Sequence, residues 1–430
     1  MKSAIKELEE KGKAAKTVAR KLAFLSTKIK NRALLNIADA LIDKLNDILI
    51  ANKIDYEKAK ASGMSEAMLD RLMLSPPRLE GMAEDVKAVA TLPDPVGEEF
   101  ERRTLPNGLE ISKKRVPLGV IGAIYESRPN VTIDISSLCL KSGNAVILRG
   151  GKEATNSNKA LAKVAQEACD LAGVPHGAIQ FIESTERALV KHMLKMKGII
   201  DLMIPRGGAE LIKLVSENAA MPVVTGGIGV CHTYVDTSAD LDKAVAIACN
   251  AKVQRPTVCN ALDCILVHNQ IAQDYLPAIA QEWARAGVEM HCDKRAMAIL
   301  KANNVILNEV KNLLVPASDK DWGKEYLSLK ASIKVVDSLD EALEHIEKYG
   351  SGHSEAIVTE DHSAATRFLN EVDAACVYAN ASTRFTDGGQ FGLGAEIGIS
   401  TQKFHARGPM ALKELTSYKW IIQGTGQVRP

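Results

Sequence analysis

Hydrophobic residues near the start of the chain recur at the spacing of an α-helix. In "NRALLNIADALIDKLNDILIAN" one helical face would collect Leu34, Ile37, Ala38, Leu41, Leu45 and Leu49. Prolines in "SPPRLEGM" and "TLPDPVGEE" interrupt this pattern. The sequence therefore predicts that the segment up to about residue 95 is helical only.

A β-hairpin is predicted directly after these helices. In "FERRTLPNGLEISKKRVPLGV" the pair Asn107-Gly108 separates two strand-like runs, which indicates a type I′ turn. Both arms are polar and charged, so we expect the hairpin to project from the body and to pair with another element or subunit. The tail "GPMALKELTSYKWIIQGTG" alternates weakly and is a candidate strand for that pairing.

Apolar runs that alternate with helical segments begin at Val116. The strand candidates are "GVIGAIY", "NAVILR", "AIQFIE", "IIDLMIP" and "MPVVTG". Such near-continuous apolar strands, separated by helices, indicate a parallel sheet covered on both faces. A second series starts near His232 with "HTYVD", "DCILVH", "VEMHC", "SIKVVD", "EAIVTE" and "AACVYAN". The fold class is therefore α/β, with two α/β domains.

Composition narrows the range of partners. The 430 residues carry 54 basic and 53 acidic side chains, a net charge of +1, so no global field favours nucleic acid or a membrane surface. The first residues lack the apolar core of a signal peptide, and no apolar run is long enough to span a bilayer. The eight cysteines are scattered, mostly within apolar runs, which is typical of a reduced, cytoplasmic protein.

Two strand-to-helix corners are candidates for binding phosphate groups. One holds Arg149, Gly150, Gly151 and Lys152, and the other holds Arg206, Gly207 and Gly208. Glycines let a phosphate approach the backbone, and a helix N-terminus offers unpaired N–H groups. Arg149 and Lys152 could bind the 2′-phosphate of an adenosine. Either corner alone could be an ordinary glycine turn with surface cations, but two on one sheet favour a dinucleotide.

The stretch "KVQRPTVCNALDCILVH" contains two cysteines five residues apart. Cys-x4-Cys is not a usual zinc spacing, so we predict no metal site here. Cys264 opens an apolar strand and is expected in the core. Cys259 follows a turn at Pro256 and lies near Arg255, whose charge could favour the thiolate. Spacing alone leaves open whether Cys259 is catalytic.

Two later segments are also candidates for the site. The glycine-rich stretch from Arg384 to Gly398 is expected to be a mobile active-site or interdomain loop. His405 and Arg407 form a cationic spot that could bind an anionic substrate, although such residues are usually solvated surface.

Several segments together resemble the aldehyde dehydrogenase superfamily. They are "YESRPNVTIDISSLCLKSGNAVILRGGKEA", "IPRGGAELI", "QRPTVCNALDCILVH", "GSGHSEAIVTED" and "FGLGAEIGISTQKFHARGPMALKELTSYKW". The resemblance implies an NADP-binding, Rossmann-like domain over 1–99 and 120–230, and a catalytic α/β domain over 231–400. It also implies an oligomerisation element formed by 100–119 and 408–430, and hence a homo-oligomer.

The resemblance also implies roles for individual residues. Cys259 would be the nucleophile, NADPH would lie across the two glycine corners, and Glu325 would contact the nicotinamide ribose. Ser127 stands where oxidising members carry an asparagine that binds the oxyanion, and Asn130 follows close behind. The candidates for binding substrate phosphate or carboxylate are Arg128, Arg206, Arg255, His405 and Arg407.

One difference from the oxidising members concerns the residue that activates water. Those members have a glutamate in a Glu-Leu-Gly-Gly stretch that activates water, whereas "VVTGGIGV" has no carboxylate. Its loss suits reduction of an acyl phosphate, because the thioester must survive until hydride arrives. The implied reaction is NADPH-dependent reduction of L-glutamyl 5-phosphate to the semialdehyde, in proline synthesis, with glutamate kinase as a possible partner. Oxidation of a small aldehyde, or a catalytically silent NADP-binding protein, are the alternatives.

Overall fold

The computed structural model describes residues 2–224, 226, 228–302 and 312–429. The chain forms two compact units. The first comprises Met1–Thr225, Gly392–Gly398 and Pro409–Pro430, and the second comprises Gly226–Phe391 and Ile399–Gly408. Within the described residues, no helix combines the length and apolar character that crossing a membrane requires.

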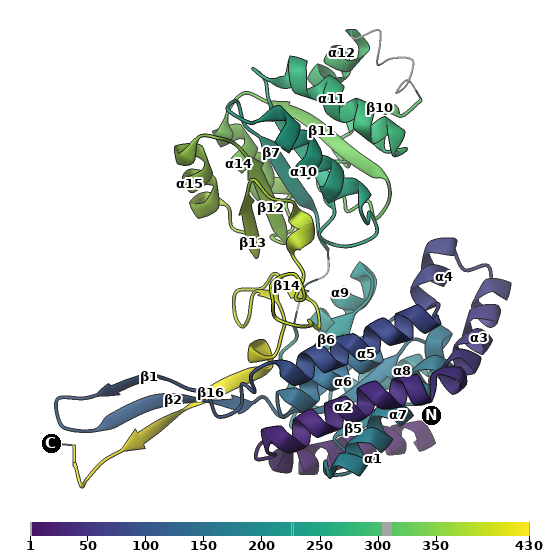
Figure 1. Cartoon of the computed structure of the whole chain (residues 1–430), viewed down its shortest axis with the longest axis vertical. Coiled ribbons are helices and arrows are strands. Elements are labelled where there is room, and N and C mark those ends of the chain that lie inside the picture. Colours follow the sequence, from purple (N-terminus) through teal and green to yellow (C-terminus); the bar gives the residue numbers. More distant parts are fainter. Residues whose placement is uncertain (1, 225, 227, 303–311, 430) are drawn as a thin grey trace. The chain divides into compact units, whose positions relative to one another are not determined.

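The first unit is built on a parallel sheet of order β5-β4-β3-β6. Its strands are β3 (Val120–Tyr125), β4 (Ala145–Gly150), β5 (Ile179–Phe181) and β6 (Leu202–Arg206). Helices surround the sheet (Figure 1), because strands that are apolar throughout need cover on both faces. The helices are α1 (Lys2–Leu22), α2 (Thr27–Asp43), α3 (Leu45–Ala61), α4 (Glu66–Leu72), α5 (Pro76–Thr91), α6 (Val131–Lys141), α7 (Thr155–Ala172), α8 (Arg187–Met193) and α9 (Ala209–Asn218).

The helical N-terminus differs from its predicted pattern at one point. Leu34, Ile37, Ala38 and Leu41 of α2 are fully buried, as predicted. The chain then breaks at Lys44, which ends α2 and precedes α3 with φ −100° and ψ 15°. This break turns the buried face, so Ile48 enters the core while Leu45 and Leu49 stay half-buried. The prediction of one continuous face through Leu49 was wrong.

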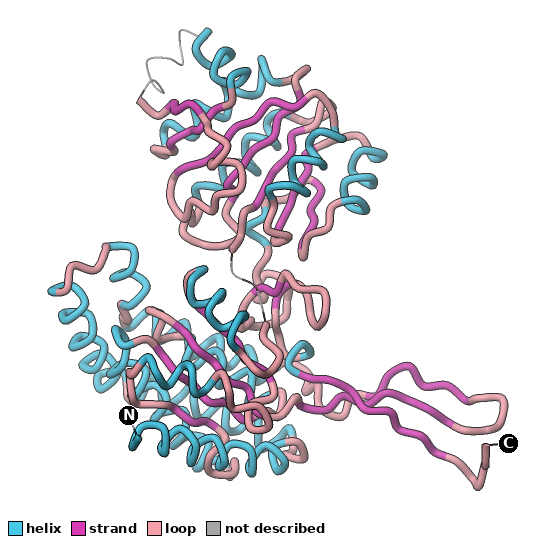
Figure 2. Tube along the Cα trace, turned by 180° about the vertical axis from the view of Figure 1, so that it is seen from behind, coloured by secondary structure: helices cyan, strands magenta, loops and turns pink. Residues whose placement is uncertain are grey.

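The predicted hairpin and its partner strand form a three-stranded antiparallel sheet. β1 (Glu99–Thr104) pairs with β2 (Glu110–Pro117), and β16 (Thr416–Gln423) pairs with the full length of β2. Figure 2 shows these strands extending away from the helices of the first unit. The pairing of the tail with the hairpin is confirmed.

The hairpin turn is of a different type from the prediction. Gly108 has a φ of +84°, whereas Asn107 is not among the residues with positive φ. The Gly108 N–H donates to the Leu105 carbonyl at 2.9 Å, which closes a type I turn followed by a left-handed glycine. Pro106 explains the change, since its fixed negative φ suits the first central position of that turn.

The second unit contains a parallel sheet of order β10-β9-β11-β8-β7-β12-β13. The strands are β7 (Cys231–Val235), β8 (Leu262–His268), β9 (Glu289–Cys292), β10 (Leu314–Pro316), β11 (Lys330–Val336), β12 (Ser354–Val358) and β13 (Cys376–Ala379). The helices are α10 (Leu241–Val253), α11 (Ala272–Arg285), α12 (Lys294–Ala302), α14 (Leu339–Tyr349) and α15 (His362–Glu371). Two short strands, β14 (Ile399–Ser400) and β15 (Gly408–Pro409), form a separate sheet.

One predicted strand did not form. Within "MPVVTG" the described residues make only an isolated bridge, between Val223 and Met203 of β6. Thr225 of that segment lies outside the described residues.

Candidate active site

Cys259 lies in the loop that joins α10 to β8 in the second unit. The loop starts after Val253, turns at Pro256 and leads into β8, all of whose residues are buried. Cys259 is half-buried at the carboxyl end of this loop. Cys264 is 1% exposed inside the strand, which confirms its predicted place in the core. Of the two cysteines, Cys259 is therefore the one that a substrate can reach.

A glycine packs directly on the nucleophile candidate. A Cβ added at Gly229 would collide with the carbonyl oxygen, the carbonyl carbon and the Cα of Cys259. Since these are backbone atoms, no side-chain movement could relieve the collision. The Gly229 N–H donates to Glu325 Oε1 at 3.0 Å. The structure thus brings the predicted cofactor residue Glu325 to the segment that supports Cys259.

A second cysteine supports the same loop. The Cys231 thiol donates to the Cys259 carbonyl oxygen at 3.2 Å. Burial raises the pKa of Cys231 well above its ordinary value, and the charges of Glu355, Asp263 and Cys259 add to this shift. Cys231 therefore remains a thiol and a hydrogen-bond donor, which leaves Cys259 as the thiolate candidate of this pair.

Arg384 is a site residue that sequence reasoning missed. It lies in the short helix η2 (Thr383–Phe385), where its guanidinium donates to the side chains of Gln254 and Asn260. Burial lowers the pKa of Arg384, Arg255 lowers it further, and Cys259 acts in the opposite direction. Arg384 thus interacts electrostatically with both Cys259 and Arg255.

No sequence signal could have found Arg384. It opens the glycine-rich stretch, but 124 positions separate it from Asn260, and nothing in the spacing links the two. Asn260 makes the connection in the folded chain: its side-chain amide donates to the Thr386 carbonyl at 2.9 Å, and its own carbonyl accepts from Thr383.

The first glycine corner follows β4 in the first unit. A Cβ at Gly150 would meet the side-chain amide of Asn158, and a Cβ at Gly151 would meet the Glu153 carboxylate, so these side chains would have to shift. Arg149 is half-buried and donates to the Thr185 carbonyl at 3.1 Å, and burial lowers its pKa. The Lys152 side chain is exposed at the start of η1 (Lys152–Ala154). This corner presents two cations, and the Glu153 carboxylate lies against its Gly151.

The second glycine corner, between β6 and α9, already binds an anionic group. The Gly208 N–H donates to Glu126 Oε2 at 3.0 Å, at the N-terminus of α9. This carboxylate lies where a helix N-terminus attracts negative charge. A Cβ at Gly207 would overlap the same carboxylate. The corner therefore fits a phosphate group, provided that the Glu126 side chain moves aside.

Ser127 and Asn130 lie in the loop between β3 and α6 of the first unit. Ser127 adopts a φ of +44°, and its N–H and hydroxyl donate to Glu153 Oε1 at 2.7 and 3.0 Å. Asn130 donates to Asp134 at 2.8 Å. Both donors thus have protein partners in this structure. Their predicted part in binding an oxyanion stays a prediction.

Charged groups cluster around Asp134 in the same unit. Burial raises the pKa of Asp134 to about 7, Asp85 adds to the rise, and Arg206 and Arg128 oppose it. Arg206 also packs against Gly398, where a Cβ would lie 3.1 Å from its guanidinium. The structure therefore brings together two of the predicted cationic residues, Arg128 and Arg206.

The predicted residue Arg407 belongs to another group in the second unit. Its guanidinium donates to the Asp373 carboxylate at 2.6 Å and to the Asp373 carbonyl at 2.9 Å. Lys403 also pairs with Asp373. His405 lies between these two cations in the sequence. Arg407 and Lys403 are thus engaged by an aspartate, whereas Arg255 and Arg384 act near Cys259.

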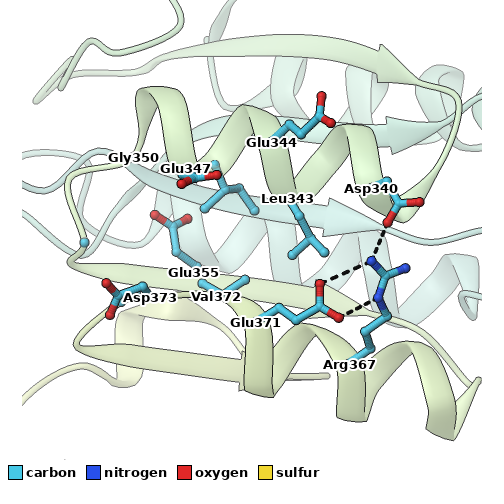
Figure 3. Close-up of a pocket in the computed structure, with 13 residues that line it drawn as sticks. Asp340, Leu343, Glu344, Glu347, Gly350, Glu355, Arg367, Glu371, Val372 and Asp373 are labelled. Carbon is cyan, nitrogen blue, oxygen red and sulfur yellow. Dashed lines mark hydrogen bonds and ion pairs between the residues drawn. The ribbon is translucent and has the colours of Figure 1, made fainter.

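A pocket of about 520 Å³ in the second unit lies beside α14 and α15 (Figure 3). Its acidic lining residues are Asp340, Glu344, Glu347, Glu355, Glu371 and Asp373. Arg367 pairs with Asp340 and Glu371. Such a surface repels a phosphorylated substrate, and Cys259 is not among its described lining residues. This pocket is therefore not the reaction site.

Comparisons with known proteins agree on one family. The sequence model of the aldehyde dehydrogenase family matches residues 2–306. The chain is 60% identical to the gamma-glutamyl phosphate reductase of Dehalococcoides mccartyi, with 100% of both chains covered. It is 54% identical to that of Caldanaerobacter subterraneus, covering 98% of this chain and 100% of the other.

Solved structures extend the comparison to the fold. The crystal structure of gamma-glutamyl phosphate reductase from Thermotoga maritima matches with a TM-score of 0.93 at 48% identity, covering 99% of this chain and 100% of that one. An acetylating aldehyde dehydrogenase from Geobacillus thermoglucosidasius matches with a TM-score of 0.71 at 18% identity, covering 100% and 98% of the two chains. The second likeness concerns the fold alone.

Proposed function

Because the chain belongs to the aldehyde dehydrogenase family, we propose that it reduces L-glutamyl 5-phosphate to L-glutamate 5-semialdehyde and phosphate with NADPH, in the second step of proline biosynthesis. The observation that carries this function is the full-length identity of 60% to a gamma-glutamyl phosphate reductase. In addition to this identity, the loop that holds Cys259 supplies a nucleophile and nearby cations.

The Cys259 sulfur attacks the acyl carbon, and the acyl–phosphate bond breaks with phosphate as leaving group. Arg384 favours the attacking thiolate, because its positive charge interacts with Cys259, and Arg255 lies in the same loop as Cys259 and interacts with Arg384. The same two cations suit the phosphate of the substrate. Since phosphate leaves as an anion, this step needs no strong general acid.

The thioester on Cys259 must not be hydrolysed before hydride reaches it. The segment "VVTGGIGV" contains no carboxylate that could activate water. Gly229 of this segment packs on the Cys259 backbone, and its N–H is directed to Glu325. This arrangement supports reduction of an acyl phosphate over oxidation of an aldehyde to an acid.

NADPH, when bound, supplies the hydride that reduces the thioester. The residues that fit this cofactor are those of the two glycine corners. The Gly207-Gly208 corner accepts an anion, as its hydrogen bond to Glu126 indicates. Arg149 and Lys152 provide positive charge for the 2′-phosphate that distinguishes NADPH from NADH. Glu325 is the proposed contact of the nicotinamide ribose.

Two features of the chain support proposals about its oligomeric state and its cellular compartment. The three-stranded sheet exposes Tyr418, Trp420 and Ile422, an apolar strip that suits pairing between copies of the chain. None of the eight cysteines, all within the described residues, forms a disulfide, which supports a place in the reducing cytoplasm. A separate glutamate kinase is the proposed source of the acyl phosphate.

A coupled assay with glutamate kinase, glutamate, ATP and NADPH tests the function. We expect NADPH oxidation that depends on both the kinase and ATP. Cys259→Ser should lose this activity, and Cys264→Ser should keep it if it folds. NADPH oxidation without ATP, or full activity of Cys259→Ser, would overturn the assignment.

A further inference from the structure

Three side chains of types that bind metals meet in the core of the second unit, on the sheet that also supports the Cys259 loop. They are His232 of β7, Cys264 of β8 and His345 of α14, and one ligand atom of each lies within 4.8 Å of the others. Within the described part of the chain, this is the one group of three or more His, Cys, Asp or Glu side chains found at such distances. The side chains of His232, Cys264 and His345 are called the His-Cys-His cluster below.

The fold itself brings these residues together. β7 and β8 are parallel neighbours, and His232 is the direct partner of Cys264 in their register. Both side chains therefore point to the same face of the sheet. α14 covers that face and places His345 Nε2 at 3.8 Å from the Cys264 sulfur. Because 81 positions separate Cys264 from His345, sequence spacing could not reveal the cluster.

The hydrogen bonds around His232 leave one ring nitrogen for a ligand. Its Nδ1 lies 3.0 Å from Glu355 Oε2, and its Nε2 is buried without a hydrogen-bond partner. His232 is 0% exposed. A carboxylate that holds one ring nitrogen while the other nitrogen faces a metal is the usual outer-shell arrangement of metal-ligating histidines.

We propose that the His-Cys-His cluster binds a single Zn²⁺ ion through His232 Nε2, the Cys264 sulfur and His345 Nε2. In a tetrahedral zinc site such atoms are about 3.3 to 3.6 Å apart, given Zn–N distances of ~2.0 Å and Zn–S distances of ~2.3 Å. The Cys264–His345 distance is already close to this range. The fourth position is left for a water molecule.

Charge balance supports a divalent ion at this buried position. Zn²⁺ brings two positive charges, and the Cys264 thiolate and the Glu355 carboxylate supply two negative ones. The thiol proton leaves on binding, as for other thiolate ligands. Around the cluster lie apolar side chains of the core, including Tyr234, Leu266 and Ile346, which limit competition from water.

Two further charged residues near the cluster, Lys334 and Glu341, form an ion pair with each other. Lys334 Nζ lies 3.4 Å from His345 Nδ1 and 3.1 Å from the Glu341 carboxylate. When His345 Nε2 binds the ion, Nδ1 carries the proton and can no longer accept from Lys334, so the Lys334 ammonium must turn to its ion pair with Glu341. The rings of Trp322 and Tyr349 pack against His345, with centroid distances of 5.6 and 4.7 Å, and hold it in place.

Cobalt titration of the chelator-treated protein tests the proposal, with Co²⁺ as a coloured substitute for Zn²⁺. The Cys259→Ser background removes the half-buried thiol of the candidate active site as a competing ligand. We expect one equivalent of Co²⁺ to bind and to give a thiolate-to-cobalt charge-transfer band. Zn²⁺ should displace Co²⁺, whereas Mg²⁺, which prefers oxygen ligands, should not.

Matched variants locate the site. Cys264→Ser should abolish the band, and His345→Gln should weaken Co²⁺ binding by ~100-fold or more, since even outer-shell changes cost 10- to 100-fold. Cys292→Ser removes a buried cysteine from another strand of the same sheet and should leave binding unchanged. Absence of the band in the Cys259→Ser background, or its persistence in Cys264→Ser, would overturn the proposal.

A second readout covers the case in which Cys264→Ser fails to fold. Zn²⁺ should raise the Tm of the Cys259→Ser protein, because an ion that binds only the folded state stabilises it. His345→Gln in that background should fold and show no rise. An equal rise in both proteins would contradict binding at the His-Cys-His cluster.

Discussion

The candidate residues of the first unit and those of the second unit are held in place in different ways. In the first unit, each glycine corner is a short run of neighbouring residues, such as Arg149 to Lys152, at the end of a strand. In the second unit, the Cys259 loop is held by Gly229 and Cys231, and by Arg384 from a distant part of the sequence, while Glu325 binds Gly229. A corner tolerates a changed side chain, whereas the loop depends on several distant contacts at once.

This comparison predicts the largest effect at the nucleophile itself. Cys259→Ser should lower kcat for the acyl phosphate by at least ~10⁴-fold, since the loss of a nucleophile removes the covalent route. Binding of NADPH, measured by fluorescence titration, should stay within about twofold of the parent protein, because the corners belong to the other unit. Loss of NADPH binding in Cys259→Ser would contradict the proposal that the first unit binds the cofactor and the second unit carries the nucleophile.

The next largest effect is expected where the backbone supports the loop. Gly229→Ala should lower kcat by roughly 100-fold, because the added Cβ would displace Cys259 and small misplacements of a reacting group are costly. The control is Gly81→Ala in α5, where a Cβ meets nothing within 4 Å. That variant should keep full activity and gain up to ~1 kcal/mol in the free energy of unfolding. Unchanged activity of Gly229→Ala would refute the tight fit.

A smaller effect is expected for the cation that sequence reasoning missed. Arg384→Met should lower kcat/KM by roughly 30-fold, a typical result of losing hydrogen bonds to a charged group. It should also raise the pKa of the Cys259 thiol, measured as the pH dependence of iodoacetamide labelling, since the positive charge near the thiolate is gone. Arg384→Lys, which keeps the charge, should restore the pH dependence in part. If the pH dependence of labelling is the same in Arg384→Met as in the parent protein, Arg384 does not influence the Cys259 thiol.

The smallest effect is expected at a corner. Lys152→Glu should weaken NADPH binding by about 5- to 10-fold while changing NADH binding little, since an exposed charge acts weakly in water. Lys163→Glu, an exposed residue of α7, is the charge-matched control and should leave the ratio of the two affinities unchanged. Equal losses for NADPH and NADH would remove the argument for the 2′-phosphate.

How much of the molecule could be predicted follows from the same comparison. The strands of both parallel sheets except β10, and the position of both glycine corners at strand ends, were found because local patterns of apolar residues and glycine encode them. The segment "MPVVTG" was predicted as a strand but makes only an isolated bridge. The pairing of β16 with β2 was also predicted, since the two runs complement each other. The break at Lys44 and the turn at Asn107-Gly108 were missed, because tertiary packing and Pro106 decided them.

The contacts around Cys259 could not be predicted from local sequence patterns. Gly229 is required because a backbone carbonyl 30 positions later lies against it, and Arg384 reaches the loop only through the folded sheet. The His-Cys-His cluster illustrates the same limit. Cys264 was assigned correctly to the core, but its neighbours His232 and His345 become visible only when α14 covers β7 and β8.

The central claim is that phosphate, and not water, takes the acyl group from Cys259. The most direct test runs the reaction in reverse, from glutamate 5-semialdehyde and NADP⁺, with and without inorganic phosphate. The account predicts sustained NADPH formation only with phosphate, and at most one turnover per active site without it. Sustained turnover in phosphate-free buffer would mean that water resolves the thioester, and the chain would then be an oxidising aldehyde dehydrogenase.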